Sequence, residues 1–228
     1  MNDVGLSWLR DPLIVEERPD WLFLRKRSGE PTLLPNDGSD RPSTVGRLLE
    51  AAPWQGELAW PPGFEGGIAH RLDVQTSGLV VAATSVDALA DGRELFASGA
   101  LRKHYRFLTD RDVEWDEHVV GWELAHDRRD RRKMVWRRGR STPHRGRWYP
   151  AETELRRVGA RGPLTEWEAV IRTGVTHQIR VHAASCGLAL LGDRLYGGTA
   201  DPDGFRLHHV GIDGWPGGTP RLDPPWEE

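Results

Sequence analysis

The segment EGGIAHRLDVQTSGLVVAA, residues 65–83, places one carboxylate, Asp73, where a turn leads into an apolar run. Gly66, Gly67 and Gly78 flank this acid, and glycines permit tight turns and the close approach of a ligand. Catalytic groups are often found on loops that a rigid scaffold positions. We therefore take Asp73 as a candidate catalytic acid, the alternative being an aspartate that only caps its own turn.

A second group of polar residues lies in TGVTHQIRVHAASCGLALLGDRLYGG, residues 173–198, where Arg180 follows His177 by three positions. A buried carboxylate is costly unless it is paired, and the guanidinium fork of an arginine suits it. We therefore expect Arg180 to pair with Asp73.

Histidines raise the alternative of a metal site. His177 and His182 are five positions apart, which separates them by about 140° on a helix and puts them on opposite faces of a strand. His208 and His209 do not complete a known ligand spacing. We predict no metal site, and we interpret the single cysteine, Cys186, as a small buried residue rather than a nucleophile.

Two long motifs resemble those of one enzyme family. HRLDVQTSGLVVAA is similar to the H-R-L-D-x-x-T-S-G-L signature of RluA-type pseudouridine synthases, and THQIRVHAASCGLALLGDRLYG to their T-H-Q-I-R-V-H…G-D-x-L-Y-G segment. The stretches LIVEERPDWLFLRKRSG, KHY, PAETELRRV and LHHVGI match further parts of the family in order. The resemblance covers about residues 12–226.

The resemblance implies roles for four residues. Asp73 aligns with the aspartate that starts cleavage of the uridine N-glycosidic bond, by attack at C1′ or by removal of the 2′ proton. Arg180 aligns with the arginine that pairs with this carboxylate. Tyr105 aligns with the tyrosine that packs against the uracil ring and assists proton removal from C5. Arg71 aligns with the residue that fills the space left by the flipped base.

The implied activity is isomerisation of a uridine in tRNA or rRNA to pseudouridine, with RNA as the partner and no cofactor. The nucleotide must leave its stack, and an aromatic face offsets part of that cost. The other residues expected to bind RNA are His70, Thr76, Lys103, His177 and Gln178.

Three alternatives are weaker. A catalytically silent RNA-binding protein with the same fold has no need of a buried acid. A carboxylate glycosidase needs a second positioned acid, and a kinase needs more than the H-R-D-like HRLD. The chain also departs from the family pattern: residues 25–27 read RKR in place of N-K-P, Val175 replaces an arginine, and Val74 replaces a charged residue. These changes leave the reaction intact and the target uridine open.

Positive charge is concentrated in residues 128–147, which hold ten Arg or Lys and one acid, Asp130. Clustered cations bind phosphates with release of counterions, although a solvated arginine-rich hairpin is the alternative. Trp136 and Trp148 either stack on bases or belong to the core. The residues that we expect to contact RNA here are Arg131, Arg132 and Arg138.

Helices are expected at 43–52, with Ser43 or Thr44 as N-cap, and at 86–98 after Ser85. A third, short helix is expected within residues 174–187, where Thr176 is the predicted cap, Gly187 the end, and apolar residues recur at i, i+4 and i+7.

Strands are expected at 79–83, 165–173 and 101–110, the last with Lys103 and Tyr105 on one face. Strands cluster and helices fall irregularly between them. This order predicts an α+β fold with a mixed, mostly antiparallel central sheet, flanked by short helices and loops, and with an active-site cleft across the sheet.

The length of 228 residues suits one catalytic domain over 1–228, with no N-terminal S4-like domain. No apolar run reaches the roughly 20 residues of a membrane helix, and the N-terminus lacks the pattern of a signal peptide. The lone cysteine fits a reducing compartment. We therefore expect a cytoplasmic monomer with no membrane association and no obligatory protein partner.

Overall fold

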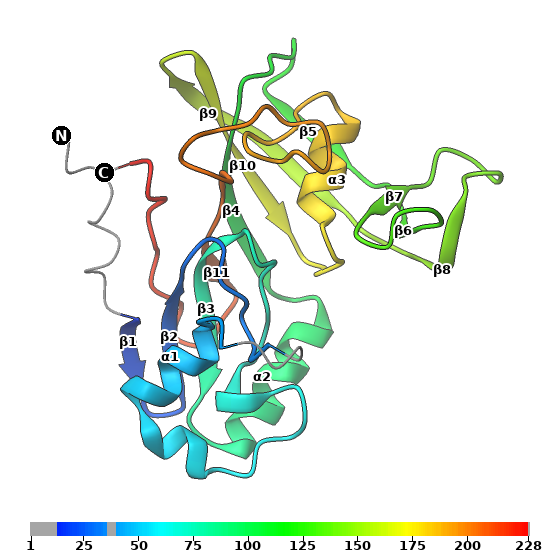
Figure 1. Ribbon diagram of the computed structural model, residues 1–228. Coiled ribbons are helices and arrows are strands. Elements are labelled where there is room, and N and C mark those ends of the chain that lie inside the picture. Colours follow the sequence, from blue (N-terminus) through cyan, green and yellow to red (C-terminus); the bar gives the residue numbers. More distant parts are fainter. Residues whose placement is uncertain (1–12, 36–39, 228) are drawn as a thin grey trace. The chain divides into compact units, whose positions relative to one another are not determined.

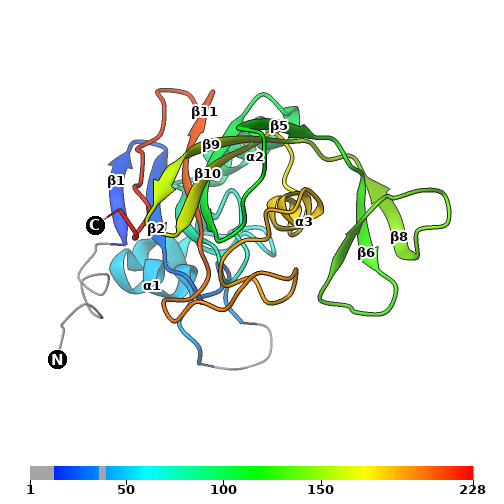
Figure 2. The ribbon, with the colours of Figure 1, turned by 90° about the horizontal axis from the view of Figure 1, so that it is seen from above.

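The computed structural model describes residues 13–35 and 40–227, which form two compact units (Figures 1 and 2). One unit contains the described residues up to Leu101 and from His209 onward, and the other comprises Arg102–His208. The expectation of a single domain stays a prediction.

The first unit is a sheet with helices packed on it (Figure 1). Its strands, in their order across the sheet, are β1 (Ile14–Arg18), β2 (Trp21–Lys26), β3 (Ser77–Ala83) and β11 (Leu207–Asp213), the last belonging to this unit from His209 onward. Its helices are α1 (Thr44–Ala51), α2 (Val86–Ser98) and two short 3₁₀ turns, η2 (Pro53–Glu57) and η3 (Glu65–Gly67).

The core of this unit lies on both faces of β3, all of whose residues are buried. On one face Leu48 of α1 packs with Val80, and on the other Leu79 packs with Leu95 and Phe96 of α2. Because side chains of a strand alternate between faces, β3 supplies both clusters. The buried strand predicted after Asp73 is confirmed.

Both helices of this unit begin as predicted. The backbone N–H of Gly46 donates to Ser43 Oγ at 3.0 Å, and that of Ala88 donates to Ser85 Oγ at 3.1 Å. These bonds satisfy N–H groups that a first helical turn leaves without partners. Helix α2 ends at Gly99, whose φ of 71° is left-handed.

The second unit is built on an antiparallel sheet. Its strands, in order, are β4 (Arg102–Thr109), β10 (Leu164–Ile171), β9 (Thr153–Arg161) and β5 (Glu117–Val120). A small second sheet contains β7 (Met134–Trp136), β6 (Leu124–Asp127) and β8 (His144–Tyr149), and the helix is α3 (Gln178–Ser185). As predicted, β4 buries Lys103 and Tyr105 on one face.

The predicted N-cap of the third helix is wrong. Helix α3 is preceded by His177, whose φ of 56° is left-handed, and no side chain caps it. The side chain of Gln178 closes the preceding turn instead, since its Oε1 accepts from Val175 N–H at 3.2 Å. The helix therefore starts one residue later than a cap at Thr176 requires. It ends as expected before Gly187, whose φ is 85°.

The fold is α+β with mostly antiparallel strands, as the sequence predicted. Within the described residues, every helix is too short or too polar to cross a bilayer. The cleft across the sheet stays a prediction.

Candidate active site

Asp73 opens a tight turn at the entrance to β3. Its backbone carbonyl accepts a hydrogen bond from the N–H of Thr76 at 3.0 Å, and β3 begins at the next residue. Asp73 is half-buried, while Val74 and Gln75 at the tip of the turn are exposed. An aspartate is a favoured first residue of such a turn. The sequence therefore positions this carboxylate at the edge of a rigid strand.

A buried lysine, Lys26, stabilises the Asp73 turn through hydrogen bonds to its backbone carbonyls. Lys26 is 1% exposed, and its Nζ donates to the carbonyls of Thr76 at 2.7 Å, Val74 at 3.0 Å and Arg27 at 3.0 Å. An ammonium group has three donors, so these bonds use all of them. Lys26 ends β2, and Gly78 of β3 lies opposite it in the sheet. The adjacent strands thus carry the lysine to the turn.

The pKa of Lys26 reflects both its burial and its proximity to two carboxylates. Burial lowers its pKa from 10.5 to about 8, and the carboxylates of Glu30 and Asp73 oppose that shift. The cation therefore lies close enough to Asp73 to interact with its carboxylate. Lys26 was not among the residues predicted from the sequence, although RKR retains the lysine of the family's N-K-P.

The loop that follows β2 also donates hydrogen bonds to the Asp73 turn, from a backbone N–H and from two hydroxyl groups. Three further contacts join them: Gly29 N–H to the Val74 carbonyl at 2.9 Å, Ser28 Oγ to the Gln75 carbonyl at 2.6 Å, and Thr32 Oγ1 to the Leu72 carbonyl at 3.1 Å. Residues on both sides of Asp73 are therefore fixed. A carboxylate held in this way is preorganised for chemistry.

Glu30 fastens this loop to α1. Its carboxylate accepts from Thr44 Oγ1 at 2.9 Å and pairs with Arg47 at 3.2 Å. Glu30 is buried, so the ion pair and the hydroxyl offset the cost of burying its charge. The support of the Asp73 turn thus extends through the loop to a helix.

The other predicted residues of this unit differ in exposure. His70 is half-buried, accepts at Nε2 from the Val81 N–H at 3.2 Å, and packs its ring on Phe96. Thr76 is 2% exposed, and Arg71 is exposed. His70 and Thr76 thus hold the segment that carries Asp73. RNA contacts for these three residues stay predictions.

Tyr105 and Lys103 are neighbours on one face of β4 in the second unit. Tyr105 is 7% exposed and lies opposite Ala169 of β10, and Lys103 is 8% exposed. Burial lowers the pKa of Lys103 to about 8. A side chain on Gly174 would begin 3.1 Å from Lys103 Nζ, so the ammonium lies directly against that glycine. The tyrosine and the lysine are therefore held in a packed surface.

Arg180 forms a buried two-point ion pair with Asp193. Nε lies 2.7 Å from Oδ2 and Nη2 lies 2.8 Å from Oδ1, with side chains 8% and 1% exposed. Asp193 was not predicted from the sequence, although it is the aspartate of the quoted GDRLYG motif. The predicted pairing of Arg180 with Asp73 joins the two units and stays a prediction.

Two aromatic rings also pack against the same guanidinium. The Tyr196 and Phe205 ring centres lie 5.0 and 5.1 Å from Arg180 Cζ. The Tyr196 hydroxyl accepts from Met134 N–H at 2.8 Å and lies 2.7 Å from His177 Nδ1. One tyrosine therefore joins β7, the left-handed start of α3 and Arg180. Strained backbone of the kind seen at His177 is often found near functional sites.

The remaining polar residues of α3 have structural partners. Gln178 is 2% exposed and donates from Nε2 to the Glu152 carbonyl at 2.8 Å. His182 contacts Thr153 Oγ1 at 2.8 Å and the Trp122 carbonyl at 3.0 Å, and burial lowers its pKa. In the described ranges, no three His, Cys, Asp or Glu side chains gather as metal ligands. RNA contacts for His177 and Gln178 stay predictions.

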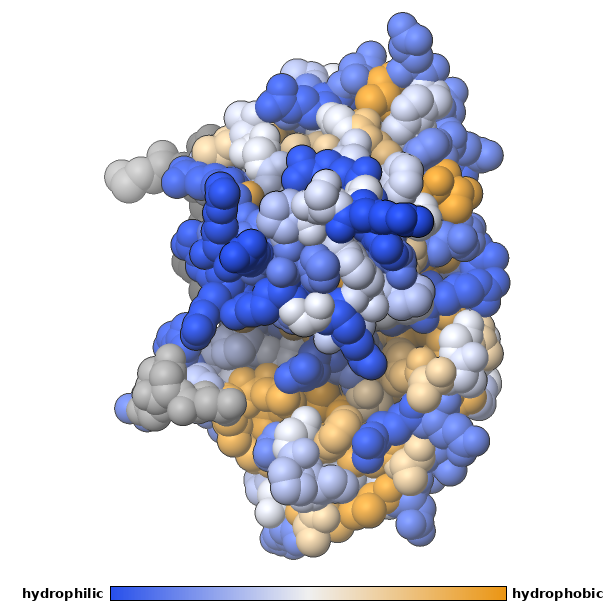
Figure 3. Space-filling view, turned by 90° about the vertical axis from the view of Figure 1, so that its right-hand side faces the viewer, coloured by the Kyte–Doolittle hydropathy of each residue, from blue (hydrophilic) through white to orange (hydrophobic). Residues whose placement is uncertain are grey.

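We call residues 124–149, which form β6, β7 and β8, the basic arm. Its exposed cations include Arg131, Arg132 and Arg138, and hydrophilic atoms dominate the centre of the face shown in Figure 3. Arg132 pairs with Asp130 at 2.9 Å, which lowers the pKa of that carboxyl to about 2. Trp136 is half-buried beneath Arg138, whose Cζ lies 5.7 Å from the ring centre. Trp136 packs against a buried apolar cluster, as the core interpretation predicted, and its stacking on a base stays a prediction.

Comparison with known proteins identifies the class. Residues 61–185 match the family described as RNA pseudouridylate synthase, and the chain belongs to this family. Ribosomal large subunit pseudouridine synthase D of Nitrosomonas europaea is 31% identical over 210 residues, which is 90% of this chain and 54% of that protein. RNA pseudouridine synthase 2, chloroplastic, of Oryza sativa subsp. japonica is 37% identical over 139 residues, 58% of this chain and 30% of that protein.

The fold agrees. Human RNA Pseudouridylate Synthase Domain Containing 1 matches with a TM-score of 0.70 at 21% identity, over 90% of this chain and 78% of that one. The chain spans 30% to 54% of the length of three curated relatives that it matches.

Proposed function

We propose that this protein is an RNA pseudouridine synthase in which Asp73 is the catalytic aspartate. The observation that most supports this proposal is the rigid turn at Asp73. Lys26 and the loop after β2 stabilise this turn through several hydrogen bonds. Such support is expected for a reactive group rather than for a surface turn. Membership of the RNA pseudouridylate synthase family supports the same assignment.

The reaction is an isomerisation. The C1′–N1 bond of a uridine breaks, the detached uracil turns, a C1′–C5 bond forms, and the proton on C5 is lost as N1 gains one. Asp73 starts the sequence either by attack at C1′ or by removal of the 2′ proton. No electrons are gained or lost overall, so the proposal includes no cofactor.

Tyr105 and Arg180 complete the proposed machinery. Tyr105 offers a buried aromatic face for the uracil, and base–aromatic stacking contributes about 1–3 kcal/mol. Asp193 and two aromatic rings fix Arg180, which in this proposal orients the Asp73 carboxylate. The pair with Asp193 uses Nε and Nη2 of the guanidinium.

The proposed substrate is a uridine in rRNA or tRNA. Matching relatives from Zymomonas mobilis and Nitrosomonas europaea are named as synthases of the ribosomal large subunit, so its RNA is the first substrate to test. The exposed cations of the basic arm supply the proposed contacts with phosphates.

The test is tritium release from transcripts of ribosomal and transfer RNA that carry [5-³H]uridine. We expect release by the wild-type protein and none by Asp73→Asn, which preserves size and the backbone bond to Thr76. The matched control is Asp91→Asn, an exposed aspartate on α2, which should release tritium normally. Release by Asp73→Asn contradicts the role of Asp73. RNA binding without release by the wild type favours a silent binding protein.

A further inference from the structure

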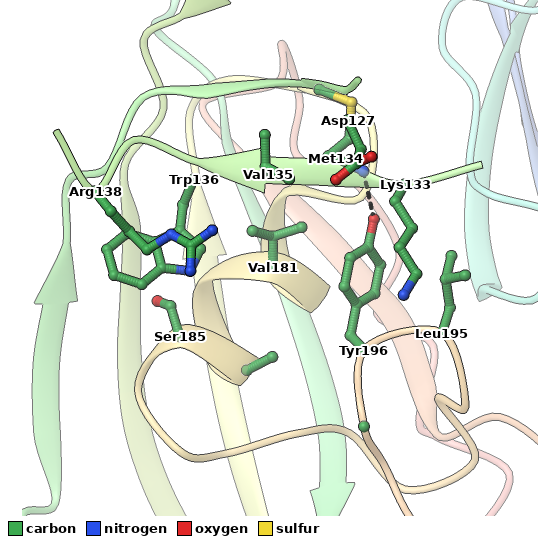
Figure 4. A pocket seen from close by; sticks show the side chains of 12 residues that line it. Asp127, Lys133, Met134, Val135, Trp136, Arg138, Val181, Ser185, Leu195 and Tyr196 are labelled. Carbon is green, nitrogen blue, oxygen red and sulfur yellow. Dashed lines mark hydrogen bonds between the residues drawn. The ribbon is translucent and has the colours of Figure 1, made fainter. Parts of the chain in front are cut away.

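The second unit contains a pocket between the basic arm and α3, with a volume of about 430 Å³ (Figure 4). This size lies within the roughly 300–1,000 Å³ of small-molecule sites. It is walled by β7, by one face of α3 and by the loop after Asp193. Its lining residues that matter here are Asp127, Lys133, Trp136, Arg138, Ala184 and Tyr196.

The pocket combines an apolar interior with aromatic walls. Val181 of α3 faces it from below and Val135 of β7 from above, and Trp136 and Tyr196 lie at its two sides (Figure 4). The Arg138 guanidinium lies along the Trp136 indole, with Cζ 5.7 Å from the ring centre. Indole faces and guanidinium planes are the surfaces on which RNA-binding proteins stack unpaired bases.

Two cations border this interior. Lys133 directly precedes β7 and Arg138 follows it by two residues, and both line the pocket. Two nearby ion pairs join Arg132 to Asp130 within the arm and Arg137 to Glu123, the residue just before it. Lys133 and Arg138 take part in neither of these pairs, so they are suited to a phosphate of a bound nucleotide.

One acid lies at the same border. Asp127 Oδ1 accepts from the N–H groups of Arg129 at 2.6 Å and Asp130 at 2.8 Å, which fixes the carboxylate at the end of β6. A carboxylate accepts hydrogen bonds from the amino groups of cytosine, adenine and guanine, whereas uracil offers only its N3–H, which lies between two carbonyl oxygens that repel the carboxylate. The acid therefore adds a preference among bases to a site that otherwise attracts phosphate.

We infer that this pocket binds one unpaired nucleotide of the RNA, with an amino-bearing base (cytosine, adenine or guanine) beside Trp136. Its phosphate contacts Lys133 and Arg138, and its amino group donates to Asp127. The inference rests on the proposed function for the supply of RNA. It adds a second nucleotide subsite, separate from the Asp73 turn, through which the protein selects its RNA by a base other than the target uridine.

The test uses the intact protein and mononucleotides, without RNA and without turnover. The indole Nε1–H resonance of Trp136 is followed by NMR during titration with CMP, AMP, UMP and ribose 5-phosphate. We expect saturable shifts with CMP and AMP, weaker binding of UMP, and little effect of ribose 5-phosphate on the indole. Equal binding of UMP and CMP, or no saturation with any of them, overturns the inference.

Two variants distinguish nucleotide binding in the pocket from nonspecific attraction of phosphate to the positive charge of the basic arm. Lys133→Gln and Arg140→Gln each remove one positive charge from the arm, but only Lys133 lines the pocket. We expect about tenfold weaker CMP binding in Lys133→Gln, the effect of one lost charge-assisted contact, and less than about twofold in Arg140→Gln. Equal losses of CMP affinity in the two variants overturn the inference, because they would show that the positive charge of the whole arm attracts the phosphate.

Two further variants test the interior and the acid. Ala184→Phe fills the pocket from α3 without altering charge and should abolish the shifts. Asp127→Asn keeps Oδ1 for the turn and replaces the other oxygen with a donor, so it should reverse the preference from CMP towards UMP. An unchanged preference in Asp127→Asn contradicts the assigned role. Because the readout is mononucleotide binding, this inference can fail while tritium release succeeds, and the reverse.

Discussion

Arg180 and Asp193 form a two-point ion pair that is almost fully buried in the second unit, with N–O distances of 2.7 and 2.8 Å. The carboxylate also accepts from the Leu195 N–H at 3.2 Å. Asp193 thus orients the arginine of the proposed site, and the aromatic rings of Tyr196 and Phe205 confine it further.

Asp193→Asn is expected to lower the free energy of unfolding by about 3–5 kcal/mol, because it leaves the Arg180 charge buried without its partner. Urea denaturation measures this. The control is Asp112→Asn, since the carboxylate that pairs with Arg157 there is 82% exposed and should cost less than about 1 kcal/mol. Similar losses in the two variants would mean that the buried pair contributes no more than a surface pair.

Tyr196→Phe is expected to weaken the junction between the basic arm and α3. It removes the hydroxyl that contacts Met134 N–H and His177 Nδ1 but keeps the ring beside Arg180. A buried group left without a partner costs about 1–3 kcal/mol. Hydrogen exchange of the Met134 amide should accelerate, and Tyr149→Phe, on β8, is the control. Unchanged protection at Met134 would show that the hydroxyl is dispensable.

Lys26→Met is expected to slow pseudouridine formation by about 10- to 100-fold while RNA affinity stays within about twofold, because a displaced catalytic group loses rate rather than binding. The methionine fills similar space but cannot donate to the carbonyls of Val74 and Thr76. Single-turnover rates and filter binding separate the two quantities. A wild-type rate would show that the loop after β2 positions Asp73 without the lysine.

The pH dependence of activity and of stability should differ in sign above pH 8. The pKa of Lys26 is about 8 in the folded protein, against the ordinary lysine value of 10.5. Above pH 8 the neutral amine keeps two donors for three carbonyls, so activity should decline with an apparent pKa near 8.

Stability should change in the opposite direction over the same range. Between about pH 8 and 10.5 the unfolded chain binds more protons at Lys26 and Lys103 than the folded one, so the free energy of unfolding gains a rising contribution. Urea denaturation at pH 7.5 and 9.5 measures it, and the rise should shrink in Lys26→Met and in Lys103→Met. An activity loss accompanied by falling stability would indicate general unfolding instead.

Replacing Arg131, Arg132 and Arg138 together by glutamate is expected to weaken RNA binding and flatten its dependence on salt. Each lost contact with a single-stranded phosphate should lower the slope of log K against log salt by about 0.7. Binding isotherms at several salt concentrations measure this. Unchanged affinity at low and high salt would identify the arm as a solvated hairpin.

The sequence was most informative where a signal depends on residues a few positions apart. Ser43 and Ser85 cap the helices that they were predicted to cap, and β4 alternates as its pattern indicated. The order of strands and helices led to the α+β fold, and the family motifs led to the RNA pseudouridylate synthase family. The start of α3 was misplaced, because the left-handed backbone of His177, whose ring contacts Tyr196 from 19 positions away, follows no local residue pattern.

By itself, the sequence determined the family, the caps of α1 and α2, the strands β3, β4 and β10, and the acid at the entrance to β3, since all of these follow from local spacing or from matched motifs. Only the tertiary structure decided the partners of the buried charges. Lys26 donates to the carbonyl of Val74, 48 positions away in the sequence, and Arg180 pairs with Asp193, 13 positions away. A buried charge is stable only with partners that packing brings to it from elsewhere in the chain, and such choices leave no periodic trace in the sequence.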